Sequence, residues 1–104
     1  MAVNLETKAI STPKGLAEGI SLKWESFSLL LIGAPKGFLA CCIFDIDIID
    51  QFGKPAALVK SSPDSPIGTL DNMLTLPLMK VNAKAAELGL EEGMPVASAL
   101  ELLF

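Results

Sequence analysis

The first half of the chain carries the apolar patterns of β-strands. Residues 4–10 are mostly polar with apolar positions between, which predicts an edge strand. In residues 16–24, apolar side chains such as Ile20 and Leu22 alternate with polar ones such as Ser21. This alternation has the two-residue period of a half-exposed strand, so we expect the large apolar side chains to form its inner face.

The next two segments are apolar at nearly every position. Residues 27–32 and 38–43 have no inside–outside alternation, which is typical of central strands buried on both faces. Together they approach the length of a membrane span with Lys36 as the one charge. However, residues 34–37 read Ala-Pro-Lys-Gly, which would break a spanning helix. The sequence therefore predicts two strands joined by a turn.

Residues 44–52 fit two patterns. Asp45 and Asp47 alternate with isoleucines as in a strand, but apolar residues also recur every three positions as on one helical face. We favour a short helix, because Asp45 is a suitable N-cap and Gly53 is a stop signal. Residues 56–60 then form a short buried strand.

The second half is mostly helical. A loop over residues 61–68 precedes Thr69, the predicted N-cap of a helix that ends before Pro77. Residues 78–81 follow as a last strand, and Asn82 caps a further helix.

The last two helices have different surroundings. Gly89 ends the helix that Asn82 caps, and Pro95 occupies a predicted first helical position. The helix from Pro95 to residue 104 is almost wholly apolar, which predicts burial against the sheet or against another subunit.

This order of elements predicts one α+β domain over residues 1–104. We expect an N-terminal antiparallel or mixed sheet of about five strands, with three to four short helices packed on it. The chain is 51% hydrophobic and weighs 11.0 kDa. Small domains bury a smaller share of their surface, so this composition predicts a homo-oligomer.

The charged residues exclude several partners and reactions. The net charge is −4, and all eight cations are single, scattered lysines with no arginine. Nucleic acid and anionic membranes select clustered cations, so neither is expected as a partner. The chain also has no histidine and no tyrosine. Imidazole acid–base catalysis and histidine metal ligation are therefore excluded, and no cofactor is predicted.

The two cysteines are neighbours, Cys41 and Cys42. Adjacent cysteines do not bridge without distorting the peptide between them, so no disulfide is expected. The first residues lack the basic start and apolar stretch of a signal peptide. Both observations lead us to expect a cytoplasmic protein.

An ordered set of short motifs resembles a known family. The set is FLACCIFD at residues 38–45, Gly53, AALV at 56–59, TLDNML at 69–74, AELGL at 86–90, GM at 93–94 and ALE at 99–101, with Glu18-Gly19 upstream. In this order the motifs resemble the YunC-like family of small bacterial and archaeal proteins, a domain of unknown function, over residues 16–103. Two departures are an insertion at residues 61–65 and Cys42 in place of a small residue. The resemblance implies an α+β fold and an intracellular setting, and supplies no catalytic residues.

Cys41 is the one side chain with nucleophilic promise, and Asp45 or Asp71 is its candidate neighbour. On a strand, Cys41 and Cys42 point to opposite faces and do not form a dithiol pair. No histidine or arginine is present to activate either thiol. We therefore interpret both cysteines as structural, and keep a Cys41 nucleophile as the alternative.

Two further groups are weaker candidates. Asp45, Asp47 and Asp50 form the densest acidic cluster, and hard divalent cations bind carboxylates. The cluster lacks calcium-loop spacing, so a solvated helix face is the preferred interpretation. Lys60, Ser61 and Thr69 are candidates for an anion site, but no glycine-rich phosphate motif accompanies them, and an ordinary capped helix is preferred.

Trp24 ends a strand, where it could stack a ligand or, as we prefer, close the core. The sequence thus leaves the activity unknown. The preferred hypothesis is a small cytosolic, self-associating module that binds a small molecule or a partner and is not an enzyme. The alternative is an enzyme of unknown class that uses Cys41 as its nucleophile near the Asp45 helix start.

Overall fold

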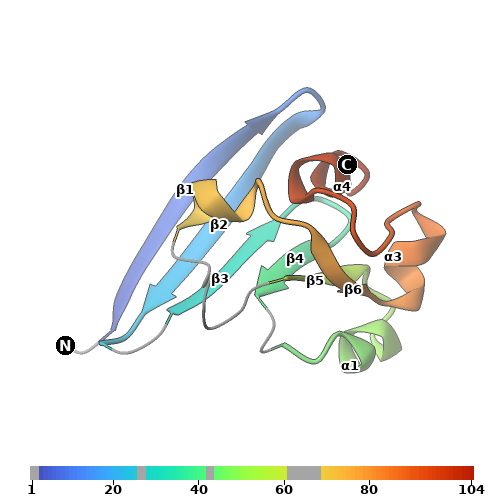
Figure 1. Cartoon of the computed structure of the whole chain (residues 1–104), viewed down its shortest axis with the longest axis horizontal. Helices are drawn as coiled ribbons and strands as arrows, with labels where there is room; N and C mark the ends of the chain where they lie inside the picture. The colour runs from blue at the N-terminus through green and yellow to red at the C-terminus, as the bar shows by residue number, and fades with distance from the viewer. Residues whose placement is uncertain (1–2, 26–27, 42–43, 61–68) are drawn as a thin grey trace.

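The computed structural model describes residues 3–25, 28–41, 44–60 and 69–104. Its centre is a six-stranded sheet with the strands in chain order, shown in Figure 1. The strands are β1 (Asn4–Thr12), β2 (Gly15–Lys23), β3 (Ser28–Gly33), β4 (Phe38–Cys41), β5 (Ala56–Val59) and β6 (Leu78–Val81). The predicted α+β class is confirmed, with one strand more than the five expected.

The sheet is mixed. Strands β1 to β4 form antiparallel pairs, and β1 and β2 are paired along their whole length as a long hairpin. Strand β5 lies parallel to β4, and β6 is antiparallel to β5. The parallel pair follows from the chain between β4 and β5, which contains a helix and returns to the same end of the sheet.

In the described part of the chain, four short helices accompany the sheet, and their bounds are α1 (Ile46–Gln51), α2 (Leu70–Met73), α3 (Ala83–Glu87) and α4 (Val96–Glu101). The predicted N-caps Asp45, Thr69 and Asn82 are confirmed, because each side chain accepts a hydrogen bond from the backbone of the first turn. Pro95 is the N-cap of α4, whereas the sequence predicts it at the first helical position. The helix ends at Glu101, before the predicted end at residue 104.

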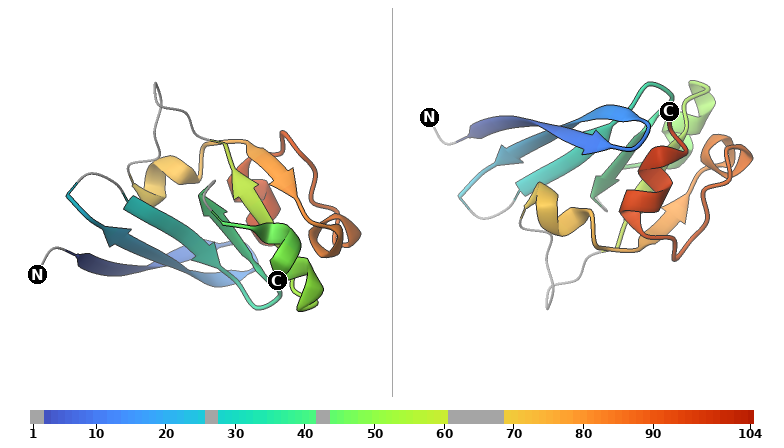
Figure 2. Two further views of the ribbon diagram at one scale, coloured as in Figure 1. Left: turned by 90° about the horizontal axis from the view of Figure 1, so that it is seen from below. Right: turned by 90° about the horizontal axis from the view of Figure 1, so that it is seen from above.

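The two faces of the sheet are covered differently. The main core contains Ala57 and Val59 of β5, together with buried residues of α2, α3 and α4. The alternate residues Ala56 and Leu58 belong to a smaller cluster with Ile46 of α1. Since successive strand residues point to opposite faces, α1 covers the face opposite α4, as Figure 2 shows. All of β5 is therefore buried.

Strand β2 differs from the sequence prediction in which face points inward. The alternation predicted a strand, but Ser21 is 3% exposed and Ala17 is 3% exposed, whereas Ile20 and Leu22 are half-buried. The inner face of β2 is therefore the face with small side chains, and the large ones lie on the opposite, less covered face.

The segments predicted at residues 38–43 and 27–32 are confirmed as strands over their described parts. No helix among the described residues is long and apolar enough to cross a membrane. The predicted loop at residues 61–68 lies outside the described residues.

Candidate functional site

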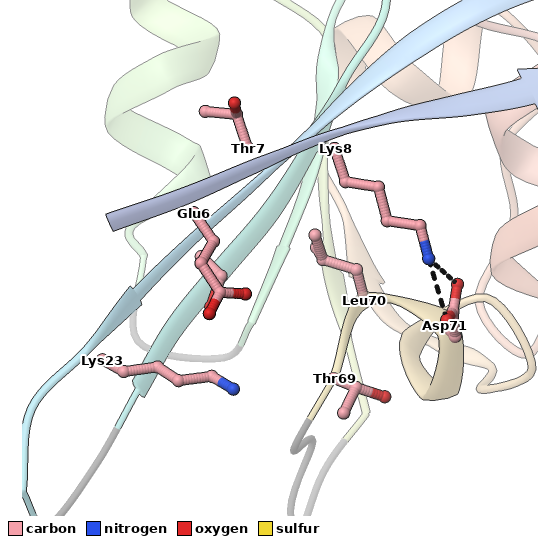
Figure 3. A pocket seen from close by; sticks show the side chains of 8 residues that line it. Glu6, Thr7, Lys8, Lys23, Thr69, Leu70 and Asp71 are labelled. Atoms are coloured by element: carbon pink, nitrogen blue, oxygen red, sulfur yellow. Dashed lines mark hydrogen bonds and ion pairs between the residues drawn. The ribbon is translucent and has the colours of Figure 1, made fainter. Parts of the chain in front are cut away.

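A cavity of about 230 Å³ lies between the β1–β2 hairpin and α2, as Figure 3 shows. We call it the α2 cavity. The side chains that define it are Glu6, Lys8, Ser21, Lys23, Thr69, Leu70 and Asp71. They come from a hairpin near the start of the chain and a helix more than forty residues later, so the cavity exists only in the folded protein.

The register of the hairpin places these side chains together. Glu6 is directly opposite Ser21, and Lys8 is directly opposite Gly19, so all four positions share one face of the sheet. Closer to the turn of the hairpin, the same face carries the buried Ala17 opposite Ile10. The cavity is thus the polar continuation of the core face.

Gly19 allows α2 to approach this face. A Cβ atom on Gly19 would lie 2.8 Å from Leu70 Cδ1 and 3.1 Å from Ile10 Cδ1. Leu70 therefore packs directly over the strand backbone, where any other residue would displace it. This close packing fixes α2 as the roof of the α2 cavity.

An ion pair joins the two sides of the cavity. Lys8 Nζ donates to Asp71 Oδ1 at 2.7 Å and to Oδ2 at 2.9 Å. The two side chains are about half to three-quarters exposed, so the pair contributes little to stability, on the order of 0–1 kcal/mol. Its main effect is that the charges of Lys8 and Asp71 neutralise each other at one end of the cavity.

Ser21 is the most unusual residue of the cavity. It is 3% exposed, and its Oγ has no hydrogen-bond partner among the described residues. An unsatisfied buried polar group costs about 1–3 kcal/mol, and most buried hydroxyls are paired. The cavity wall thus contains an unused hydroxyl group.

Two opposite charges border the cavity without a partner among the described residues. Glu6 and Lys23 lie on the same sheet face as Ser21, since Lys23 is opposite Asn4 and Glu6 is opposite Ser21. Figure 3 shows both side chains directed toward the cavity. The hydroxyl of Thr69 accepts from Asn72 N at 3.0 Å and still has its own hydrogen to donate.

The nucleophile candidate and its neighbours have structural contacts of their own. Cys41 is a free thiol, 7% exposed, within the main core. Asp45 accepts from Asp47 N at 3.1 Å and from Ile48 N at 3.3 Å as the cap of α1. Asp71 holds Lys8 at the cavity. Catalysis by these residues stays a prediction, and Cys42 lies outside the described residues.

The acidic cluster is distributed over three different contacts. Asp45 caps α1, Asp47 Oδ2 accepts from Lys80 Nζ at 2.8 Å, and Asp50 Oδ1 accepts from Lys84 N at 2.9 Å. The hydrogen bond to Asp47, and then the charge of Asp47, raise the pKa of Lys80 above its ordinary value. In the part of the chain that the structure describes, no three acidic or cysteine side chains are grouped to hold a metal ion.

The predicted anion-site residues are separated. The backbone N–H of Lys60 donates to Pro77 O at 2.9 Å. Ser61 lies outside the described residues. Thr69 is the member of this group that borders the α2 cavity, where it caps α2. Trp24, the candidate stacking residue, is half-buried just after β2.

Sequence reasoning missed Ser21, Glu6 and Lys23. The alternation of Ser21 with larger apolar residues predicts that Ser21 lies on the solvent face of β2. The signal that could have found it is the small size of Ala17 and Gly19 at the same alternation, which is typical of a face closely covered by another element.

Comparison with known proteins supports the fold and describes no activity. The chain is similar to the crystal structure of TA1206, a protein of unknown function from Thermoplasma acidophilum. The TM-score is 0.87 at 18% sequence identity, and the match covers 100% of this chain and 97% of that chain. At this identity the likeness shows the fold alone. No curated protein matches the sequence.

A family model described as "Domain of unknown function (DUF1805)" matches residues 40–103. The match spans more than half of the chain, and it is consistent with the resemblance to the YunC-like family. Because this family model covers more than half of the chain, the chain belongs to the DUF1805 family, a domain of unknown function.

Proposed function

We propose that this protein is a binding module for a small zwitterionic molecule of the amino-acid type, held in the α2 cavity. The observation that carries the proposal is the buried Ser21 Oγ, which has no hydrogen-bond partner among the described residues and belongs to a residue that lines the cavity. A polar ligand atom that bonds to this hydroxyl would remove the cost of its burial.

The charges around the cavity support a zwitterion. Lys8 and Asp71 neutralise each other, which leaves Lys23 to attract a carboxylate and Glu6 to attract an ammonium group. Leu70 provides an apolar wall for a side chain. A ligand with one charge of each sign satisfies both partners, whereas a simple anion or a simple cation leaves one of them uncompensated.

The size of the cavity supports a small ligand. At about 230 Å³ the cavity lies below the roughly 300–1,000 Å³ typical of sites for drug-sized molecules. A larger, more open groove of about 520 Å³ is bordered by Phe38, Phe44 and Ile49. That groove has no buried unpaired polar side chain among the described residues, so it offers less to fix the orientation of a ligand.

The proposal is for binding without catalysis. Its support is the lack of histidine, arginine and tyrosine, together with the burial of Cys41 in the core. A cytoplasmic location is part of the proposal, because a free buried thiol and the adjacent cysteines suit a reducing compartment. We also propose that the protein works without nucleic acid or membrane as partners, on the grounds of its scattered lysines.

Amide chemical shifts of the ¹⁵N-labelled protein, followed while individual amino acids are added at millimolar concentration, test the proposal. We expect saturable shifts at Glu6, Ser21 and Lys23 with at least one amino acid. Acetate, methylammonium and inorganic phosphate serve as probes that carry one charged group only, and we expect none of them to saturate these shifts.

Ser21→Ala is the variant that tests the carrying observation, and Lys14→Ala, in the turn between β1 and β2, is its matched control. We expect Ser21→Ala to weaken binding at least tenfold and Lys14→Ala to leave it unchanged. Shifts that are absent with every amino acid, or equal binding by Ser21→Ala, would refute the proposal.

A further inference from the structure

The two edge strands of the sheet, β6 and β1, differ in whether another segment of the chain hydrogen-bonds to their outer side. At β6, the segment before α4 covers the start of the edge, because Leu78 N donates to Met94 O and Gly93 N donates to Leu78 O, each at 2.8 Å. At the other edge, β1 pairs with β2 on one side and has no strand beside it among the described residues. This edge is nine residues long and exposed at nearly every position. A long open edge is a template for pairing with another strand.

We propose that a second copy of this chain pairs with β1 in the antiparallel direction, with Thr7 opposite Thr7 of the partner subunit. The two sheets then become one continuous sheet of two subunits related by a two-fold axis. Such an isologous interface uses the same strand of both copies, so it closes at a dimer.

Charge complementarity selects this register. With Thr7 at the two-fold axis, Glu6 is directly opposite Lys8 of the partner subunit, and the same pair occurs twice. Centring the pairing on Glu6 or on Lys8 would instead put two like charges opposite each other. Within β1, the charged positions that share a face are Glu6 and Lys8, so no other register pairs both of them with opposite charges.

The required groups are available in the folded chain. None of the ion pairs among the described residues includes Glu6. Lys8 Nζ donates two hydrogen bonds to Asp71, and an ammonium group has three hydrogens. A carboxylate accepts several hydrogen bonds, so Glu6 can accept one from Lys8 of the partner subunit and another from a ligand in the α2 cavity.

The opposite face of β1 supports the same register. Leu5 is 65% exposed in the single chain and lies opposite Leu22, which in turn lies opposite Leu29 of β3. In the proposed pairing Leu5 faces Ala9 of the partner subunit. The apolar row of one sheet then continues into the next, and the most exposed leucine side chain of that row is covered.

Sedimentation velocity across a dilution series tests the proposal with two charge-reversed variants, Glu6→Lys and Lys8→Glu. Each variant alone places like charges opposite each other, so we expect at least a tenfold weaker dimer than in the unmodified chain. Mixing the two variants in equal amounts restores both opposite-charge pairs, and we expect a heterodimer in the mixture.

A covalent test does not depend on these charges. In Thr7→Cys the two new thiols face each other at the two-fold axis, so mild oxidation should give a disulfide-linked dimer on a non-reducing gel. Lys14→Cys, at the tip of the hairpin, is the matched control and should stay monomeric on that gel. A monomeric unmodified chain at high micromolar concentration, a dimer unaffected by Glu6→Lys, or equal cross-linking of the two cysteine variants would overturn the proposal.

Discussion

The side chain of Asn82 accepts a hydrogen bond from the backbone N–H of Ala56, with the nitrogen and oxygen atoms 3.1 Å apart. This bond joins the start of α3 to the start of β5. The same oxygen accepts from Ala85 N at 2.9 Å, and the amide nitrogen donates to Ile46 O and Lys54 O at 3.0 Å each. Asn82 is 2% exposed, so one buried amide connects α1, β5 and α3.

Asn82→Ala should destabilise the protein by about 2–4 kcal/mol. The variant loses a helix cap worth about 1 kcal/mol and leaves buried backbone groups unpaired at about 1–3 kcal/mol. Urea unfolding measures the change in free energy. Thr69→Ala, which removes an exposed cap, is the matched control and should cost about 1 kcal/mol. Equal effects of the two variants would contradict the role given to Asn82.

Gly37 allows the turn after β3 to pass close to the chain before β5. A Cβ atom on Gly37 would overlap the backbone oxygen of Pro55, whereas one on Gly33 would meet its nearest atom at 4.0 Å. We expect Gly37→Ala to cost about 1–3 kcal/mol, as overpacking does, and Gly33→Ala to cost clearly less. Thermal and urea unfolding of both variants check this. A Gly37→Ala protein as stable as the unmodified chain would show that the close approach is absent.

The ion pair of Lys80 and Asp47 gives a prediction for alkaline pH. The hydrogen bond and charge of Asp47 raise the pKa of Lys80 above 10.5. A raised pKa means that the contribution of the pair to stability is fully present below about 10.5, the value in the unfolded chain, and is lost as the pH rises through the higher value of the folded chain.

In Asp47→Asn, the lysine should titrate at a lower pH than in the unmodified protein. The ¹³Cε chemical shift of Lys80, followed from pH 9 to about 12 where the lysine range lies, measures this difference. Lys14, which has no ion pair among the described residues, is the internal reference. Identical titration curves for Lys80 in the two proteins would mean that the pair does not form in solution.

Burial of Cys41 predicts that its thiol is unreactive in the folded chain. In Cys42→Ser, where Cys41 is the remaining thiol, iodoacetamide at neutral pH should label the native protein at least a hundredfold more slowly than the urea-unfolded protein. Mass spectrometry gives both rates. Rapid labelling of the native variant would contradict this prediction and would support the alternative hypothesis, an enzyme that uses Cys41 as its nucleophile.

Local signals made much of the fold predictable. The side chains of Asp45, Thr69 and Asn82 cap helices through contacts within three residues along the chain, so their sequence context is sufficient to identify them. The same holds for the turn at residues 34–37, where Ala34 N donates to Gly37 O at 2.9 Å. These features need no information about distant parts of the chain.

The α2 cavity was not predictable in the same way. Its ion pair joins Lys8 to Asp71, which are 63 positions apart, and neither residue type nor spacing indicates that contact. The inner face of β2 depends on which other elements cover it, so the alternation around Ser21 predicted a strand and left the choice of face to tertiary packing. The register of β1 with β2 then decides that Glu6 is Ser21's neighbour.

The central claim is that Ser21 keeps an unpaired buried hydroxyl because a ligand uses it. The most direct measurement is the free energy of urea unfolding of the unmodified chain and of Ser21→Ala, each with and without the amino acid that shifts the cavity amides. In the unmodified chain we expect the ligand to add about 2.7 kcal/mol at a hundred times its dissociation constant. Ser21→Ala should be at least as stable without ligand, because the unsatisfied group is gone. At the same ligand concentration it should gain at most about 1.4 kcal/mol, because its binding is at least tenfold weaker. Equal stabilisation of both proteins by the ligand, or a Ser21→Ala protein that is less stable by more than about 1 kcal/mol without it, would contradict the account.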